Sequence, residues 1–267
     1  MAKNIKIIIL AAGKGERLLP LTKDMPKSLV SIFGKPILEY QLNTIKKVGI
    51  DQIILITGYL KDKIKYKNIK YFTNNNYDST NMVETLFCCK NEINDCIIVS
   101  YGDIIYEEKI LRSLSEDSSD ISVVVDKQWK KLWKLRSNNP INDTESLEIK
   151  NNKIISIGQK VNSIDEPDGQ YIGLIKFQGK GIEHLLSTYE NLRKKSLQNN
   201  GFYKNNKKFN QMYMTELLQE IIDLKYPIKP LLINGGWLEI DTIDDHKKYS
   251  ELYFKNQLND FIKIDEI

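Results

Sequence analysis

The amino-acid sequence predicts an α/β fold in which one mixed, mostly parallel sheet is covered by helices on both faces. Over the first half of the chain, short apolar runs alternate with segments of helical periodicity, as in buried parallel strands joined by helical crossovers. The 267 residues are 41% apolar and 28% charged, the balance of a globular protein. A chain of this length buries enough surface to fold without disulfides or a structural metal. Length alone allows one large domain or two small ones, and the absence of an internal repeat or low-complexity linker favours a single domain over residues 1–267.

The first half of the chain contains predicted strands and helices in alternation. The strands are expected at residues 5–10, 52–57, 69–73, 96–100 and 121–125. Apolar residues at helical spacing, with Pro36 near the start, predict a helix over residues 36–47. A second helix is expected to run from Asn81 to Cys89, because Asn81 followed by Glu84 has the spacing of a capping box.

The second half of the chain is less regular. Residues 147–150 and 154–158 flank Asn151-Asn152, a pattern that predicts a β-hairpin. The segment from about residue 126 to residue 170 departs from the strand–helix alternation, and we interpret it as a less regular insertion. The remaining expected elements are strands at residues 171–177, 228–232 and 237–240, helices at residues 180–194 and 211–224, and a C-terminal helix.

The composition excludes several classes of function. Lys+Arg 39 against Asp+Glu 35 leaves a net charge of only +4, and the four arginines are too scattered for a nucleic-acid surface. Three cysteines without a CxxC pattern exclude a disulfide framework and a cysteine zinc site, and they indicate a reducing compartment. The two histidines, His184 and His246, lie in segments typical of ordinary helix, which disfavours a Ser-His-Asp triad or a multi-histidine metal site.

Export and membrane signals are not expected. The residues from Met1 run directly into the first predicted strand, without the apolar segment and cleavage site of a signal peptide. No apolar run approaches the ~18 residues that a membrane span needs. We therefore expect a cytoplasmic protein with no membrane partner. The sequence leaves the oligomeric state open, with a homodimer as one expectation.

The segment after the first strand has the composition of a polyphosphate-binding loop. It reads Leu10-Ala-Ala-Gly13-Lys-Gly15-Glu-Arg17-Leu-Leu-Pro20-Leu-Thr-Lys-Asp-Met-Pro26-Lys27-Ser-Leu. Its small residues let backbone N–H groups approach an anion, and its basic residues add positive charge. Leu18 stands where a Walker A loop and a GxGxxG dinucleotide fingerprint each require glycine, so neither pattern applies. A Gly-x-Gly alone would also fit a plain turn between a strand and a helix.

This whole string strongly resembles LAAGxGxRxxPLTxxxPKxL, the signature of nucleoside-triphosphate transferases that activate sugar phosphates and small phosphoesters. The resemblance continues in Gly34-Lys-Pro-Ile-Leu-Glu, in Tyr101-Gly-Asp103 and in Gly236-Trp-Leu-Glu-Ile-Asp241-Thr, and it therefore spans most of the chain. It implies a Rossmann-like fold of the nucleotide-diphospho-sugar-transferase type. It also implies an enzyme that transfers a nucleoside monophosphate to an acceptor phosphate and releases pyrophosphate.

The resemblance implies a catalytic set of Lys27, Arg17, Asp103 and Asp241. Lys27 is expected to contact the α-phosphate and Arg17 the departing β- and γ-phosphates, because charge rearranges there in the transition state. Asp103 and Asp241 are expected to hold a Mg²⁺ ion. The expected nucleotide-binding residues are Leu10, Ala11, Ala12, Gly13, Lys14, Gly15, Arg17, Lys27, Thr80, Asn81, Gly102 and Asp103.

The sequence also offers a candidate third metal ligand and an alternative role for the two aspartates. Glu239 would share a strand face with Asp241 by alternation, which makes it a candidate third ligand. Taken singly, Asp103 or Asp241 could instead cap a turn or a helix. No general base is expected, because an acceptor phosphate is already ionised at pH 7.

The short length of the chain favours a cytidylyltransferase that uses CTP. Nothing after Asp241 resembles the additional C-terminal β-helix of many hexose-1-phosphate enzymes. The segment Tyr77-Asp-Ser-Thr-Asn81-Met-Val-Glu-Thr-Leu resembles the base-lining segment of short cytidylyltransferases for phosphocholine, for phosphonates and for capsule phosphoramidate synthesis. We therefore expect a role in capsule or surface-glycan modification. The alternatives are a hexose-1-phosphate nucleotidyltransferase that uses UTP, dTTP or GTP, and a non-catalytic nucleotide-binding module.

The insertion and the late helices are expected to bind the acceptor. Lys127 and Arg136 together with Glu145 would suit an acceptor with a carboxylate and an amine, which places phosphoglutamine ahead of 2-aminoethylphosphonate and phosphocholine. Trp129 and Trp133 are four residues apart, so packing on one helix face is the alternative to an aromatic cage. The expected substrate-binding residues are Lys127, Trp129, Glu145, Gln170, Tyr171, Tyr213 and Trp237.

Overall fold

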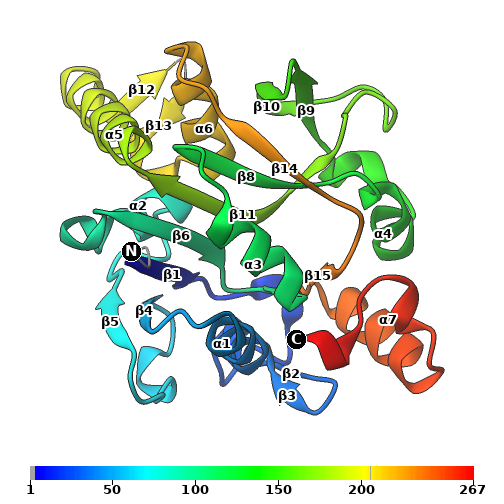
Figure 1. Cartoon of the computed structure of the whole chain (residues 1–267). Helices are drawn as coiled ribbons and strands as arrows, with labels where there is room; N and C mark the ends of the chain where they lie inside the picture. The colour runs from blue at the N-terminus through cyan, green and yellow to red at the C-terminus, as the bar shows by residue number, and fades with distance from the viewer. Residues whose placement is uncertain (1–3, 205) are drawn as a thin grey trace.

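A computed structural model describes residues 4–204 and 206–267 and contains a seven-stranded sheet of order β14-β8-β11-β6-β1-β4-β5 (Figure 1). The expectation that no signal peptide is present depends partly on residues 1–3, which lie outside the described residues. Neighbouring strands are parallel except where β11 pairs with β6 and β8. The strands are β1 (Ile5–Ala11), β4 (Gln52–Thr57), β5 (Lys70–Thr73), β6 (Cys96–Tyr101), β8 (Ile121–Asp126), β11 (Gln170–Gln178) and β14 (Lys229–Ile233).

This sheet confirms the predicted mostly parallel α/β fold. Strands β6 and β8 are buried along almost their whole length, which is why each is an unbroken apolar run in the sequence. β11 runs antiparallel to β6 and β8, and the hairpin of β9 (Glu145–Lys150) and β10 (Lys153–Lys160) lies in the connection that leads into it. Asn151 and Asn152 have left-handed φ angles of 50° and 56°, as the predicted two-residue turn requires.

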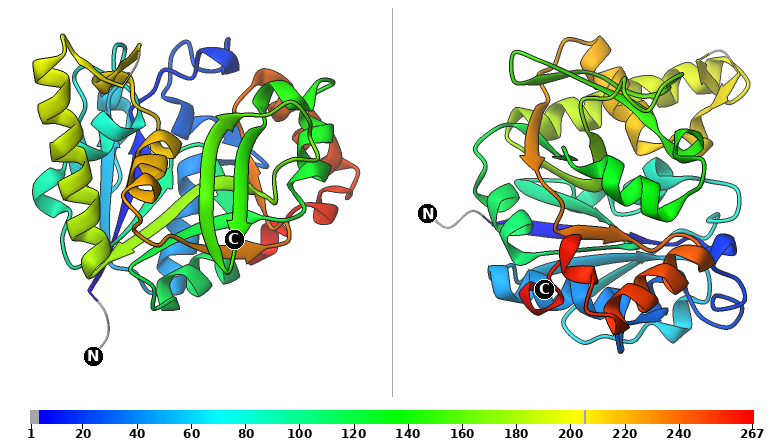
Figure 2. Two further views of the ribbon diagram at one scale, coloured as in Figure 1. Left: turned by 90° about the horizontal axis from the view of Figure 1, so that it is seen from above. Right: turned by 90° about the vertical axis from the view of Figure 1, so that its right-hand side faces the viewer.

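Helices cover both faces of the sheet, as the sequence predicted (Figure 2). Alternate residues of β1 separate the two cores, because Ile7 and Ile9 pack with α1, α3, α4 and α7, whereas Ile8 packs with α2, α5 and α6. Among the described residues, none of the helices is both long and apolar enough to cross a membrane. The helices are α1 (Ile37–Val48), α2 (Met82–Phe87), α3 (Glu108–Glu116), α4 (Trp129–Arg136), α5 (Lys180–Gln198), α6 (Met214–Asp223) and α7 (Ile243–Phe254).

Some elements differ from those predicted. Helices α3 and α4 are additional, and α4 gives a regular start to the segment interpreted as an insertion. The expected capping box of α2 does not form, because the Glu84 carboxylate accepts a hydrogen bond from the Tyr189 hydroxyl at 2.9 Å. Asn81 alone caps that helix, accepting from the Met82 N–H at 2.9 Å. The remaining strands form pairs: β2 (Ser31–Ile32) with β3 (Lys35–Pro36), β7 (Ile104–Tyr106) with β15 (Trp237–Glu239), and β12 (Phe202–Lys204) with β13 (Lys207–Lys208).

Tryptophans from α4 and β15 pack together beneath the sheet. The rings of Trp129 and Trp133 meet edge to face at 5.7 Å, and the ring of Trp133 lies 6.1 Å from that of Trp237. Trp129 and Trp237 are only 1% and 2% exposed. Of the two roles that the sequence left open, packing on one helix face is therefore the one seen here, and the aromatic cage is absent from these described residues.

Replacing Trp129 with alanine is expected to lower the free energy of unfolding by about 3–5 kcal/mol, because a buried aromatic side chain would leave a large cavity. Urea unfolding measures this loss. Phe254→Ala is the matched control, since that ring is 82% exposed and its loss should change stability by about 0.5 kcal/mol or less. Equal stability of the two variants would contradict the packing role of Trp129.

Candidate active site

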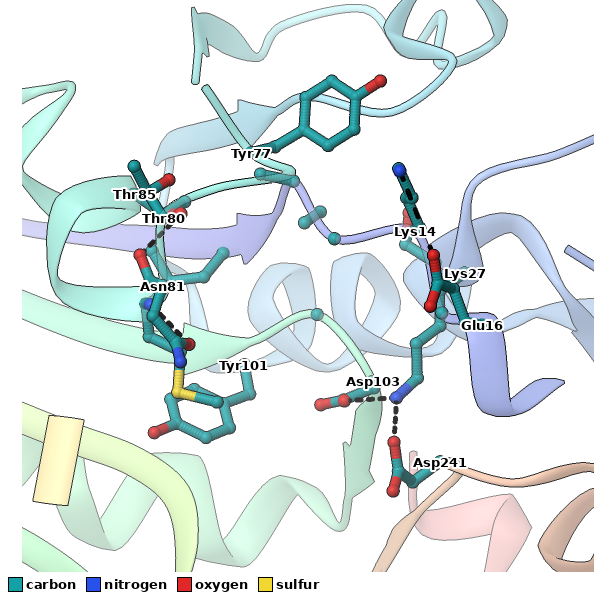
Figure 3. A pocket seen from close by; sticks show the side chains of 18 of the residues that line it. Lys14, Glu16, Lys27, Tyr77, Thr80, Asn81, Thr85, Tyr101, Asp103 and Asp241 are labelled. Atoms are coloured by element: carbon teal, nitrogen blue, oxygen red, sulfur yellow. Dashed lines mark hydrogen bonds and ion pairs between the residues drawn. The ribbon is translucent and has the colours of Figure 1, made fainter. Parts of the chain in front are cut away.

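A cavity of about 480 Å³ opens where the carboxyl ends of β1 and β6 meet the loops that follow them (Figure 3). Ligands of open α/β sheets bind at this edge. Every residue that the sequence assigned to nucleotide binding lines the cavity. The lining also includes residues outside that set, most of which belong to the quoted Tyr77–Leu86 motif or adjoin it: Glu16, Ser28, Tyr77, Asp78, Met82, Thr85 and Tyr101.

Close approach of two glycines to the end of β1 shapes the floor of the cavity. The Gly102 N–H donates to the Leu10 carbonyl at 3.0 Å, and a Cβ at Gly102 would lie 2.6 Å from that oxygen. A Cβ at Gly58 would lie equally close to the Ala12 carbonyl. Any side chain at these positions would push the loops apart, so the glycines are required by the packing of neighbouring strand ends.

The opposite wall comes from the segment that leads into α2. Buried Asn74 donates through Nδ2 to the hydroxyls of Thr80 and Thr85, both at 2.9 Å, and so fixes this wall. Across the cavity, the Lys14 ammonium lies 6.0 Å from the centre of the Tyr77 ring. Figure 3 shows the uncharged groups on one side and the ionic groups on the other. This division suits a ligand with a neutral heterocycle and an anionic chain.

The ionic side is built around two aspartates that lie far apart in the sequence. β7 pairs with β15, and the Ile240 N–H donates to the Asp103 carbonyl at 2.9 Å, which brings Asp103 beside Asp241. The Lys27 ammonium donates to Asp103 Oδ2 at 2.6 Å and to Asp241 Oδ1 at 2.7 Å. The Arg17 guanidinium lies 2.8 Å from Asp241 Oδ2. The expected catalytic set is thus one connected cluster.

These contacts keep Lys27 and Asp241 charged. Burial opposes the charge of Lys27, but Asp103 and Asp241 outweigh it and raise the pKa of Lys27 above its ordinary value. Burial likewise disfavours the ionised form of Asp241, yet Lys27, Arg17 and Arg136 hold its pKa below the usual range. Near neutral pH Lys27 is therefore an ammonium group and Asp241 a carboxylate.

Arg136 is a buried cation behind the cluster. Its side chain is 5% exposed and lies against the face of Trp133, with the guanidinium carbon 5.0 Å from the ring centre. The guanidinium pairs with Glu239 at 2.5 Å and with both oxygens of Asp245 at 3.2 and 3.3 Å. Asp245 in turn accepts from the Asp241 N–H at 3.2 Å. Arg136 thereby connects α4 to the segment that carries Asp241.

Residues 6–131 match the family model described as nucleotidyl transferase. Over 249 residues the chain is 41% identical to CTP:phosphoglutamine cytidylyltransferase of Campylobacter jejuni, which covers 89% of this chain and 96% of that relative. The chain belongs to the nucleotidyl transferase family. This confirms the family and the enzyme class that the sequence motifs predicted.

Two further proteins support membership of this nucleotidyltransferase family. Choline-phosphate cytidylyltransferase of Streptococcus pneumoniae is 35% identical over 118 residues, which covers 43% of this chain and 52% of that protein. The solved structure of CTP:phosphocholine cytidylyltransferase from Streptococcus pneumoniae superimposes with a TM-score of 0.73 at 25% identity, covering 93% of this chain and 99% of that chain. The predicted Rossmann-like fold is thereby confirmed.

The carboxylates of this nucleotidyltransferase have the chemistry of a divalent-metal site. Oxygen ligands suit Mg²⁺, which is often held by one or two carboxylates plus substrate oxygens. Asp103 Oδ1 is buried and has no hydrogen-bond partner among the described residues, so it is available as a ligand atom. Within residues 4–204 and 206–267, no group of three or more acidic, histidine or cysteine side chains is placed to hold a metal. The pair Asp103 and Asp241 therefore fits a metal that is completed by substrate.

Glu239, the expected third ligand, is paired with Arg136 and lies outside the cavity lining. Strand alternation does not relate it to Asp241, because β15 ends at Glu239. Burial, against the opposing charge of Arg136, raises the pKa of Glu239 to about 7. The structure thus gives Glu239 a role in the charge network behind the cavity.

Several expected acceptor-binding residues lie elsewhere. Trp129 and Trp237 are in the core, and the Trp237 indole N–H donates to Asp126 at 2.9 Å. The Lys127 ammonium donates to the Asp168 carbonyl at 2.5 Å, away from the cavity lining. Arg136 is occupied by carboxylates. Sequence spacing could not show these partners, because they come from distant segments.

Other expected acceptor-binding residues adjoin the cavity. The ring of Tyr171 meets that of Tyr101, a lining residue, edge to face at 5.6 Å. Burial raises the pKa of Tyr171, and the nearby carboxylates of Glu145 and Asp103 raise it further. Gln170 is buried and donates through Nε2 to the Glu145 carbonyl at 2.6 Å. Glu145 and Tyr171 thus lie close to Tyr101 and Asp103, and Gln170 bonds to the backbone of Glu145.

A second cavity of about 380 Å³ adjoins the first, and Asp78, Thr80 and Asn81 line both. Tyr213 lies in this second cavity together with Lys207. Lys207 was not among the expected residues, because its position depends on the short β12–β13 pair. Its ammonium lies 2.5 Å from Glu216, the first-turn acid of α6. The second cavity thus carries charge of both signs.

Replacing Arg136 with methionine is expected to lower the free energy of unfolding by about 3–5 kcal/mol, because it would leave buried carboxylates without a cation. The matched control is Arg112→Met, since Arg112 pairs with Glu108 on the exposed surface of α3 and its loss should cost about 1 kcal/mol or less. Urea unfolding at pH 7 compares the two. An Arg136→Met protein as stable as the control would contradict the role of Arg136.

Proposed function

We propose that this nucleotidyltransferase joins CMP from CTP to a small phosphate or phosphonate acceptor and releases pyrophosphate. Phosphoglutamine is the preferred acceptor, ahead of 2-aminoethylphosphonate and phosphocholine. The similarity over nearly the whole chain to CTP:phosphoglutamine cytidylyltransferase supports both substrates. The reaction would take place in the cytoplasm, and its product would serve capsule or surface-glycan modification. The single observation that carries the chemistry is the cluster of Lys27, Asp103 and Asp241 at the end of the phosphate-binding loop.

The reaction is an in-line displacement at the α-phosphorus of CTP. An acceptor oxyanion attacks the phosphorus and forms a new P–O bond, while the bond to the bridging oxygen of the β-phosphate breaks and pyrophosphate leaves with its electrons. No proton has to be removed from an ionised acceptor phosphate. Both reactants are anions, so catalysis consists mainly of charge neutralisation and alignment.

The chain's own cations have distinct positions for this task. Lys27, at the inner end of the cavity, is placed to neutralise the α-phosphate as its charge rearranges. Arg17 lies nearer to solvent and suits the departing pyrophosphate. Lys14 and the backbone of the glycine loop hold the triphosphate chain. Mg²⁺, held by Asp103 and Asp241, would supply Lewis-acid activation of the phosphates when bound.

The surroundings of Glu145 support an acceptor that carries an ammonium group. Desolvation raises the pKa of Glu145, although a hydrogen bond with Thr215 and the charge of Lys207 lower it. The Glu145 carboxylate lies near enough to Tyr101 and Tyr171 to raise the pKa of both hydroxyls, and these side chains together would suit an amine. Lys207 takes the place that the sequence analysis gave to Arg136 as a partner for an acceptor carboxylate. A zwitterionic amino-acid phosphate matches both charges.

Pyrophosphate release measured across CTP, UTP, dTTP and GTP, each with phosphoglutamine, 2-aminoethylphosphonate, phosphocholine and glucose-1-phosphate, tests this function. We expect the highest kcat/KM for CTP with phosphoglutamine. A preference for glucose-1-phosphate with UTP, dTTP or GTP would establish the hexose-1-phosphate alternative. Failure of every combination would favour a non-catalytic module.

Asp103→Asn and Asp241→Asn are each expected to lower kcat by roughly two orders of magnitude or more, because a neutral amide is a poor ligand for a divalent cation that stabilises the transition state. Asp244→Asn is the control, since Asp244 is an exposed residue of the same segment. Pyrophosphate release at saturating Mg²⁺ measures the effect. Wild-type rates in both cavity variants would exclude the proposed metal site.

Glu145→Gln is expected to raise the KM for phosphoglutamine by about tenfold and to leave the KM for CTP nearly unchanged, because the charged partner of the acceptor amine is lost. Glu148→Gln, which removes the same charge three residues further along the strand, is the control. Initial rates with each substrate varied in turn separate the two constants. A larger effect on CTP than on phosphoglutamine would remove Glu145 from the acceptor site.

A further inference from the structure

We propose that Lys27 and the divalent metal ion compete for the Asp103–Asp241 pair, so that the enzyme binds the metal tightly only when a nucleoside triphosphate draws Lys27 away. The inference rests on the metal site of the proposed function and adds an order of binding to it. Its basis is that a single ammonium group bonds to both carboxylates, at 2.6 and 2.7 Å (Figure 3).

The competition follows from the few oxygen atoms that the two carboxylates offer. Asp103 Oδ2 and Asp241 Oδ1 bond to Lys27, and Asp241 Oδ2 lies 2.8 Å from Arg17. Asp103 Oδ1 is the oxygen that no described group bonds. A dication that took both carboxylates would therefore share ligand atoms with an ammonium group. The dication and the ammonium group would repel each other at such short range. Each would also have to share the negative charge of the carboxylates with the other.

Burial makes this repulsion effective. The side chains of Lys27 and Asp241 are 14% and 8% exposed, so solvent screens their interactions poorly. Arg136 adds a further positive charge, with its guanidinium 4.0 Å from Asp241. The carboxylates are thus already neutralised by groups of the chain. A dication without an accompanying anion would create a net positive charge in a confined site.

A nucleoside triphosphate supplies a new partner for Lys27 and so frees the carboxylates for the metal. The stem of Lys27 packs against the phosphate-binding loop, as shown by the 2.9 Å that would separate a Cβ at Gly15 from the Cβ of Lys27. Rotation of the flexible stem can therefore redirect the ammonium from the aspartates to an α-phosphate held by that loop. The phosphate then replaces the carboxylates as partner of Lys27. The released carboxylate oxygens become ligands of the metal that accompanies the triphosphate.

Titration with Mn²⁺, followed by electron paramagnetic resonance in the absence of nucleotide, tests the competition. Wild-type enzyme is compared with Lys27→Met and with Lys46→Met, which removes the same charge from an exposed position of α1. We expect Lys27→Met to bind one Mn²⁺ about tenfold tighter than wild type or better, and Lys46→Met to match wild type. The double variant Lys27→Met/Asp103→Asn should lose the added affinity. Lys27→Gln replaces the methionine variant if circular dichroism shows that Lys27→Met is unfolded.

Each other outcome overturns the inference. Equal affinity of wild type and Lys27→Met would show that the ammonium does not compete. Tight binding of Mn²⁺ by wild type without nucleotide would show the same. Added affinity that survives Asp103→Asn would place the metal elsewhere. Failure of all proteins to bind Mn²⁺ with each of CTP, UTP, dTTP and GTP would remove the proposed metal site itself. An error in the substrates changes only which nucleotide and acceptor support pyrophosphate release, and it leaves the nucleotide-free titrations unchanged.

Discussion

Buried carboxylates that require cations beside them are the constraint around which the active site is built. Asp241 lies at the centre, with Lys27 and Arg17 on its cavity side and Arg136 behind it. Such carboxylates would be costly to bury without these partners. The partners come from the phosphate-binding loop and from α4, so the charge network ties together segments that the chain order separates. The same charges are the basis for the proposed binding of a triphosphate at this site.

The sheet makes this network possible because parallel strands bring their carboxyl ends to one edge. β1 and β6 deliver the glycine loop and Asp103 to that edge, and the pairing of β7 with β15 adds Asp241. Glycines at the strand ends allow the loops to pack within hydrogen-bond distance. The result is a cavity with an ionic side and an uncharged side, which suits a nucleotide and agrees with membership of the nucleotidyl transferase family.

The residues expected to bind the acceptor are divided between the protein interior and the cavities. Both tryptophans and the arginine of the insertion serve the structure, since Trp129 and Trp133 pack in the core and Arg136 neutralises carboxylates. The groups left near the cavity are Glu145, Tyr171 and Lys207. Charge complementarity to a zwitterionic acceptor therefore remains, but with Lys207 as its positive partner in place of Arg136. This change keeps the proposed acceptor and alters the residues that recognise it.

The mostly parallel α/β fold, the family and the proposed phosphate-binding loop could be predicted from the sequence alone. These depend on local patterns, since an apolar run of strand length and a motif of fixed spacing specify their conformation within a few residues. The assignment of Lys27 and Asp103 to one site also came from motifs. The core position of Trp129 and the pairing of Glu239 with Arg136 became evident from the three-dimensional structure alone, because each contact joins segments far apart in the chain. Whether a tryptophan or an arginine faces a substrate or the protein interior depends on those distant partners.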